Sequence, residues 1–211
     1  MKLVDNSIRE FCEKLCSDVP APGGGSTAAL AGVLGAALLV MVASLTAGRV
    51  RYAESESLMR DAIKRAEELR LSMLDIIDRD IDAFNTVSKV YAMPKDNDNE
   101  IAIRDAAMQD ALKVCSLMPF ELMECSYKAL ELADEMVGRC NVNAVSDLGV
   151  AVLNLKASAQ GAWLNVLVNL DGIRDEIFSA KYTISGSELI EVISELADSI
   201  YDEILQVLFP K

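Results

Sequence analysis

The run TAALAGVLGAALLVMVASLTA, from Thr27 to Ala47, constrains the fold more than any other part of the chain because it contains no charged residue. It has the length of a membrane-spanning helix. However, it is crowded with Ala, Gly, Ser and Thr, which favour insertion into a bilayer less than Leu or Ile do. A lone span would also leave the amphipathic segments of the chain with no central element to pack on. We therefore expect a buried central helix and no membrane partner.

Small residues recur along one side of this expected helix. On helical geometry Ala28, Gly32 and Ala36 form a narrow stripe, the kind of surface that lets a second helix approach closely. Such a stripe has no evident use facing solvent. We expect it to contribute to the interface of a homodimer.

The composition favours packed helices over sheets. Of the 211 residues, 52% are hydrophobic but only 5% are aromatic. We expect an all-α fold, in which residues 1–211 form one domain, an antiparallel helical bundle around the central small-residue helix. The net charge of −13 argues against nucleic acid as a partner, so any anionic ligand needs a local positive site.

The cysteines and the absence of histidine bear on compartment and metal binding. The chain has five cysteines, no histidine, no CxxC motif and no secretory signal in front. We expect reduced thiols in the cytoplasm and no metal site.

Helix boundaries are predicted from capping residues and prolines. Ser7 with Glu10, and Ser185 with Glu188, have the spacing of capping boxes, and Ser26 is a candidate cap for the central helix. The expected helices are 7–16, from 26 onward, 55–91, 100–116, 119–138, 146–170, and a last one that begins at 185.

The turn before the central helix reads PAPGGGST. Gly23, Gly24, Gly25 and Ser26 leave main-chain N–H groups unshielded at the positive end of a helix, which suits a carboxylate or a carbonyl-rich ring. The other interpretation is a tight turn that passes close to another part of the backbone. The glycines alone favour neither.

A line of polar and small residues follows one side of the expected helix 146–170. It is bordered by apolar residues instead of Lys and Glu, so we expect it to be buried or half-buried. Buried amides need hydrogen-bond partners, which either a ligand or a polar network between helices provides. The line consists of Asp147, Asn154, Ser158, Gly161, Asn165 and Asn169.

Two carboxylates are candidates for proton transfer. Asp80 occupies a slot in an apolar stripe that runs through Met73, Ile76 and Ile77, where a raised pKa suits a general acid or base. A structural carboxylate bonded to a helix end is the alternative. Asp147 also has a non-catalytic explanation, because an acid at a helix start interacts favourably with the helix dipole.

Several segments together resemble the folate cyclodeaminase and methenyltetrahydrofolate cyclohydrolase family. They occur in the family's order and spacing from about Ile8 to Leu170, and they read PAPGGGS, AALAGVLGAAL, MVASLTAGR with Tyr52 close behind, DIDAF, AMPK, NVNAVSDLGVA and GAWLNVLVNL. The resemblance implies an all-helical, dimeric enzyme that acts on one-carbon groups attached to tetrahydrofolate, without a metal or a further cofactor. The chain looks like the free-standing kind, since it has no room for a transferase domain.

The resemblance implies site residues for this chain. Asp80 or Asp147 would transfer protons, while the glycine turn, the two arginines of GRVRY and the polar helix would bind the substrate. The implied binding residues are Gly23, Gly24, Gly25, Ser26, Arg49, Arg51, Tyr52, Asn143, Ser146, Asn165 and Asn169.

The chain departs from the family pattern at two positions. Val50 stands in the middle of the family's basic run, and Cys140 stands where the family usually has Gly. If the family's working cation is that middle residue, either Arg49 or Arg51 replaces it or the activity is impaired. We expect hydrolysis of 5,10-methenyltetrahydrofolate to 10-formyltetrahydrofolate. The sequence leaves open the cyclodeaminase reaction on 5-formiminotetrahydrofolate, and also a non-catalytic helical dimerisation module.

Overall fold

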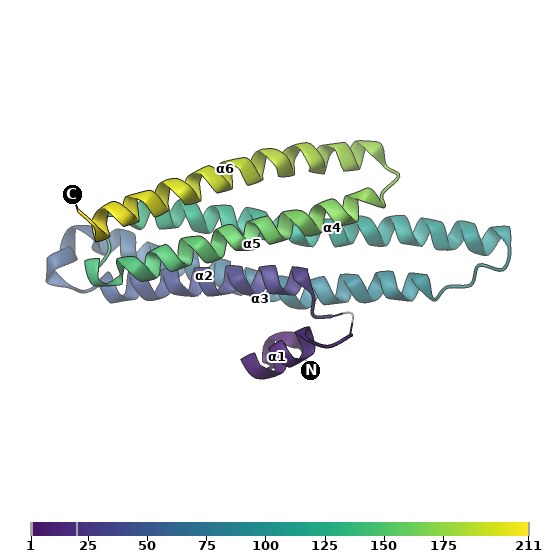
Figure 1. The fold of residues 1–211 in the computed structure, drawn as a ribbon, viewed down its shortest axis with the longest axis horizontal. Coiled ribbons are helices and arrows are strands. Elements are labelled where there is room, and N and C mark those ends of the chain that lie inside the picture. Colours follow the sequence, from purple (N-terminus) through teal and green to yellow (C-terminus); the bar gives the residue numbers. More distant parts are fainter. Residues whose placement is uncertain (1, 20, 211) are drawn as a thin grey trace.

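The computed structural model describes residues 2–19 and 21–210, and within these ranges it contains helices and turns but no strand. The expected all-α antiparallel bundle is confirmed (Figure 1). Its body consists of α2 (Gly24–Thr46), α3 (Glu56–Tyr91), α4 (Asp98–Met136) and α5 (Val145–Asp171), with α6 (Glu176–Leu208) packed along α5 and α4.

Short helical segments complete the chain. The helix α1 (Ile8–Leu15) lies beside the bundle (Figure 1) and begins with the predicted capping box, in which Ser7 and Glu10 bond each other's main-chain N–H groups. Short segments of 3-10 helix are η1 (Leu3–Asp5), η2 (Val50–Ser55), which is interrupted at Tyr52, and η3 (Val142–Ala144).

The small residues of α2 serve packing within the chain. A methyl group added to Gly161 on α5 would lie 2.9 Å from the Cβ atom of Ala28, and one added to Gly32 would lie 2.7 Å from the Ser158 hydroxyl. The stripe is therefore filled by α5 of the same chain. Our reason for expecting it at a dimer interface is wrong, because an intramolecular helix already occupies that surface.

Apolar length alone does not make α2 a membrane span. An 18-residue window within Gly24–Thr46 has a mean hydropathy of 2.4, which is apolar enough for a membrane-spanning helix. Half of that window is buried inside the bundle, and a core helix meets the same criterion of length and composition. The buried half includes Ala29, Ala36 and Leu39, whose side chains are fully enclosed. The other half is partly buried or exposed, and Leu30, Leu38 and Val40 within it still pack against the core.

Three predicted helix boundaries are wrong. The helix α2 begins two residues before Ser26, with Gly23 as the N-cap, so Ser26 is inside the first turn and caps nothing. The helix α4 runs through Pro119 without a break. The helix α6 begins at Glu176, because the Asp175 carboxylate accepts a hydrogen bond from the Phe178 N–H at 3.0 Å, and Ser185 is in its interior.

The hairpin of α3 and α4 extends past the first turn of α2 (Figure 1). Two bidentate ion pairs fix its register, Arg65 with Glu135 and Arg79 with Glu121. Both pairs are half-exposed, so they specify alignment more than they add stability. Because the hairpin continues where α2 has not yet begun, the first turn of α2 faces side chains from α3, α4 and α5.

Candidate functional site

The first turn of α2 presents main-chain donors without a side-chain cap. The N-cap Gly23 has extended backbone angles, and the first bond of the helix runs from the Thr27 N–H to the Gly23 carbonyl at 3.0 Å. The N–H groups of Gly24, Gly25 and Ser26 have no acceptor among the described residues. Together with the helix dipole they make this end of α2 a donor-rich, positive surface.

Asp80 on α3 lies against this turn. The Ser26 hydroxyl donates a hydrogen bond to the Asp80 carboxylate at 3.4 Å. A methyl group added to Gly25 would lie 2.7 Å from the nearer carboxylate oxygen, so only glycine allows the approach. Burial raises the pKa of Asp80 above its usual value, and the Ser26 hydrogen bond opposes this shift without cancelling it. The predicted raised pKa agrees with this environment.

Two amides of α5 form the opposite wall, and each donates one side-chain N–H to a main-chain carbonyl. The Asn165 side chain donates to the Gly161 carbonyl at 2.8 Å, and the Asn169 side chain donates to the Cys115 carbonyl at 3.0 Å. These bonds fix which amide atom is oxygen. Each asparagine therefore has its oxygen available as an acceptor.

These groups surround a cavity of about 210 Å³ at the start of α2. Asp80 is the only carboxylate that lines it within residues 2–19 and 21–210. The Cys115 thiol also faces it, and burial together with the Asp80 charge raises the pKa of this thiol to about 11, so it is neutral near pH 7. The lining residues are Ala21, Gly23, Gly24, Gly25, Ser26, Asp80, Ile81, Phe84, Cys115, Asn165 and Asn169.

The sequence analysis missed Ile81, Phe84 and Cys115 as lining residues. Phe84 carried one signal in the sequence, since its spacing continues the apolar stripe that contains Asp80. In the structure it is 38% exposed, where the stripe leaves the bundle core. Cys115 carried none. It lies in α4 one turn before Pro119, where the sequence analysis predicted two helices instead of one.

The other predicted site residues lie at the opposite end of α2. Arg49 precedes η2, Arg51 and Tyr52 are within it, and Asn143, Ser146 and Asp147 belong to η3 and the start of α5. The helix α2 has 23 residues, so roughly 33 Å separates its two ends. One copy of the chain therefore does not bring the two groups of residues together.

A polar network holds the second group in place. The Tyr52 hydroxyl accepts a hydrogen bond from the Val142 N–H at 3.0 Å, and the buried Asn141 donates from its side chain to the Leu45 carbonyl at 3.1 Å. The Asn141 N–H also donates to the Thr46 hydroxyl at 2.8 Å. Asn141 and Thr46 were not predicted, and both anchor η2 and η3 to the end of α2.

The two departures from the family pattern differ in their exposure. Val50 is 94% exposed between Arg49 and Arg51, so it contributes no packing. Within residues 2–19 and 21–210 neither arginine has an ion-pair partner, although the Arg51 guanidinium lies 5.7 Å from the Tyr52 ring centroid. Cys140 is buried, and burial raises the pKa of its thiol.

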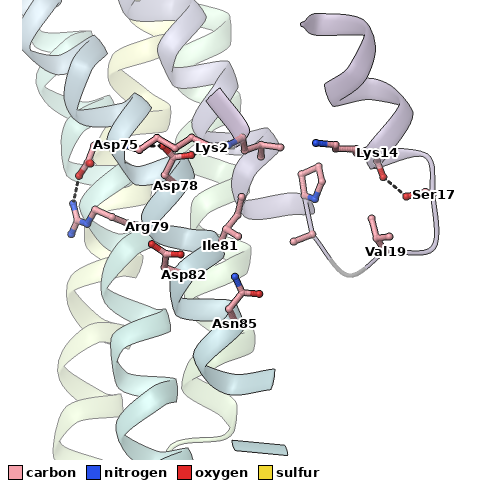
Figure 2. Close-up of a pocket in the computed structure, with 13 residues that line it drawn as sticks. Lys2, Lys14, Ser17, Val19, Asp75, Asp78, Arg79, Ile81, Asp82 and Asn85 are labelled. Atoms are coloured by element: carbon pink, nitrogen blue, oxygen red, sulfur yellow. Dashed lines mark hydrogen bonds and ion pairs between the residues drawn. The ribbon is translucent and has the colours of Figure 1, made fainter. Parts of the chain in front are cut away.

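A larger groove of about 680 Å³ separates the N-terminal segment from α3 (Figure 2). It adjoins the cavity through Ala21 and Ile81, which line both. Its charges are largely paired: Lys2 lies 3.3 Å from Asp78, and Asp75 bonds Arg79, as Figure 2 shows. The groove therefore has no net positive character.

The comparisons with known proteins agree with this geometry. A sequence model of the family described as formiminotransferase-cyclodeaminase matches residues 7–185. The chain belongs to the formiminotransferase-cyclodeaminase family. Both groups of predicted site residues fall inside the matched range.

Relatives in the formiminotransferase-cyclodeaminase family include free-standing and bifunctional proteins. A methenyltetrahydrofolate cyclohydrolase of Methylorubrum extorquens is 35% identical over 200 residues, which is 95% of this chain and 96% of that protein. The formimidoyltransferase-cyclodeaminase of Mus musculus is 33% identical over 85% of this chain, which spans only 33% of that protein's length. The crystal structure of formiminotetrahydrofolate cyclodeaminase from Thermotoga maritima superposes with a TM-score of 0.81 at 28% identity, covering 98% of both chains.

Proposed function

We propose that this protein is a folate-dependent one-carbon enzyme that hydrolyses 5,10-methenyltetrahydrofolate to 10-formyltetrahydrofolate. The observation that carries the proposal is Asp80, a half-buried carboxylate with a raised pKa that faces an uncapped helix start and two amide oxygens. The full-length similarity to a methenyltetrahydrofolate cyclohydrolase supports it.

The proposed reaction needs one group that accepts and returns protons. A water oxygen bonds to the cationic one-carbon bridge while the Asp80 carboxylate takes a proton from that water. The hydroxyl of the adduct then loses its proton, the bond from carbon to ring nitrogen N5 breaks, and N5 gains a proton. One proton is released overall. Because the bridge is already electrophilic, the proposal requires neither a metal nor a further cofactor.

The cavity has donors and acceptors on opposite sides, which suits a pterin ring. The edge of a pterin presents an amino group and a ring N–H as adjacent donors, next to a carbonyl oxygen. The amide oxygens of Asn165 and Asn169 are available to accept from such donors. The N–H groups at the start of α2 are available to bind the carbonyl.

A second candidate activity is the cyclodeaminase reaction. The structural similarity to a formiminotetrahydrofolate cyclodeaminase along the whole chain favours it. In this reaction N10 bonds to the carbon of the formimino group on N5, and the bond from that carbon to the formimino nitrogen then breaks. The nitrogen gains protons and leaves as ammonia, so a group that transfers protons, such as Asp80, would serve here too. The family relatives are named as enzymes, which favours either activity over a non-catalytic dimerisation module.

An absorbance assay separates the candidates. The chromophore of 5,10-methenyltetrahydrofolate disappears when the ring opens, and ammonia release reports the formimino substrate. We expect a rate well above the uncatalysed one with the methenyl substrate and none with the formimino substrate. The reverse result would assign the cyclodeaminase activity to this protein. Rates no higher than background with both substrates would reject both enzymatic activities. A chelator should change neither rate, and loss of activity on chelation would contradict the metal-free proposal.

The assembly and the compartment are also proposals. We propose a cytoplasmic homodimer, with its interface on the outer side of α2. All five cysteines are free, which fits a reducing compartment. Exposed apolar residues on α2, such as Leu34 at 50%, support an interface there.

A further inference from the structure

The cavity is too small and too neutral for a whole folate. Its volume of about 210 Å³ is below the range of about 300–1,000 Å³ typical for ligand pockets. No lysine or arginine lines it within the described ranges 2–19 and 21–210. A folate carries a benzoyl-glutamate tail with two carboxylates, so cations outside this cavity must hold the tail.

The neighbouring groove is a poor site for that tail. Its lysines already have partners, since Lys2 pairs with Asp78 and Lys14 donates to the Asn6 side chain at 3.0 Å. Asp75, Asp78 and Asp82 also line the groove and would repel carboxylates.

Arg49 and Arg51 are exposed cations without ion-pair partners in the described part of the chain, but they lie at the wrong end of their own copy. Roughly 33 Å of α2 separates them from the cavity, farther than one folate spans. A second copy removes this distance if it packs in the opposite direction.

An exposed apolar face connects the two ends. Most of the exposed side chains of α2 and α5 are apolar, with exposed polar exceptions such as Thr27, Ser44 and Gln160, and we name this surface the α2–α5 face. Its members include Leu34, Met41, Leu45, Val150, Leu164 and Val168, which are between 37% and 76% exposed. A bilayer is not a suitable cover, because α2 lies against the charged helix α3 and cannot enter the hydrocarbon alone.

Charge complementarity selects how two copies pair on this face. A two-fold axis parallel to the helices would place four arginines together at one end and two Asp80 cavities at the other. A two-fold axis perpendicular to the helices places the arginines of each copy at the Asp80 end of its partner. The second arrangement avoids like-charge contact and also opposes the dipoles of the two α2 helices.

We propose that two copies pair in antiparallel fashion through the α2–α5 face, so that each active site combines the Asp80 cavity of one copy with Arg49 and Arg51 of the other. The one-carbon head binds in the cavity, and the arginines bind the glutamate carboxylates of the same substrate. The inference rests on the proposed function for the identity of the ligand. The geometry of the pair stands without it.

The geometry is tested by distances between spin labels in a background where the exposed Cys12 and Cys16 are replaced by serine. Mixed dimers carry one label at Val50→Cys and the other at Phe84→Cys of the second copy. We expect a short distance for this pair and a long one between two Val50→Cys labels. A short distance between the two Val50→Cys labels would overturn the antiparallel pairing.

The face itself is tested by sedimentation. Leu34→Asp should convert the dimer to a monomer, whereas Ile184→Asp on α6, at a similarly exposed position, should not. A wild-type monomer at micromolar concentration, with or without binding to phosphatidylcholine vesicles, would overturn the proposal.

The shared site is tested by complementation. Asp80→Asn and the double variant Arg49→Ala, Arg51→Ala are coexpressed with different tags, and the mixed dimer is purified through both. One of its two sites is intact, so about half of the wild-type activity should return, although each parent is impaired. Activity no greater than the mean of the parents would place each site within one copy.

A substrate lacking glutamate isolates the role of the arginines. The double variant should have a raised KM for the glutamate-bearing substrate and an unchanged KM for the pteroyl analogue, while Lys14→Ala should change neither. If only Lys14→Ala raised the KM for the glutamate-bearing substrate, the groove and not the arginines would bind the glutamate tail. An inactive wild type would reject the proposed function, and the label distances would still decide the pairing.

Discussion

The side-chain amide of Asn169 on α5 donates a hydrogen bond to the main-chain carbonyl of Cys115 on α4, at 3.0 Å. This carbonyl is the one that Pro119 leaves without its helical partner, because proline at the fourth following position has no N–H. The proline thus does not end α4. It exposes an acceptor that holds Asn169 with its oxygen available to the cavity.

Pro119→Ala should loosen Asn169 without unfolding the protein. The new N–H would compete with Asn169 for the Cys115 carbonyl, so we expect a roughly 10-fold loss in kcat/KM from misplacement of the amide. The thermal midpoint should stay or rise, since proline in a helix interior costs about 3 kcal/mol and the lost packing offsets part of this. Kinetics and thermal unfolding measure the two effects.

The matched control is Asn169→Ala, alone and combined with Pro119→Ala. If the proline acts through Asn169, the double variant should be no worse than Asn169→Ala. Losses that multiply instead would show that the two residues act independently.

Asp80→Asn should lower turnover by roughly 100-fold or more, the usual scale for loss of a positioned proton-transfer group. The amide fills the same space beside Gly25 and Ser26, so folding and most binding should persist. Saturating kinetics measure the loss, with circular dichroism as a check of the fold. Asp147→Asn is the comparison: in the first turn of α5 it should cost only about 0.3–1 kcal/mol of stability. Unaffected turnover in Asp80→Asn with collapse in Asp147→Asn would reverse the assignment.

The stability of the protein should depend on the ionisation of Asp80. Because burial raises its pKa in the folded state, the folded protein binds more protons than the unfolded chain between the two pKa values. Stability contributed at this position therefore falls as the pH rises through that interval. Urea unfolding should show that the free energy of unfolding of Asp80→Asn increases relative to that of the wild type as the pH rises from acid to neutral. A difference in the free energy of unfolding that does not change with pH would mean that burial does not raise the pKa of Asp80.

Gly25→Ala and Gly24→Ala should differ, although the two glycines are neighbours. A methyl group at position 25 would lie 2.7 Å from the Asp80 carboxylate, whereas one at position 24 would lie 3.7 Å from Asn165, an ordinary contact. Gly25→Ala should displace Asp80 and reduce turnover by roughly 10- to 100-fold. Gly24→Ala should have a smaller effect. Equal losses in both variants, with matching losses of stability, would favour the interpretation as a tight turn.

Local patterns in the sequence determined much of the fold. The charge-free run specified α2, the capping box at Ser7 specified α1, and the long amphipathic pattern specified α3 to within one residue at its start. The raised pKa of Asp80 could also be predicted from the sequence, since this carboxylate interrupts an apolar stripe. These signals are local, because helix period and capping depend on residues within a few turns.

Only the tertiary structure decided which residues meet. The sequence grouped Asp80 with Arg49, Arg51 and Asp147, but the structure places Asp80 and the other three at opposite ends of α2. It also assigned the stripe of Ala28 and Gly32 to a second copy, whereas α5 of the same chain fills it. The sequence analysis predicted a helix break at Pro119, because the energetic cost of proline in a helix is evident from the local sequence. The hydrogen bond that compensates for the missing N–H comes from Asn169, which is 50 residues further along the chain. Contacts between distant segments depend on how whole helices pack, and no local pattern encodes that arrangement.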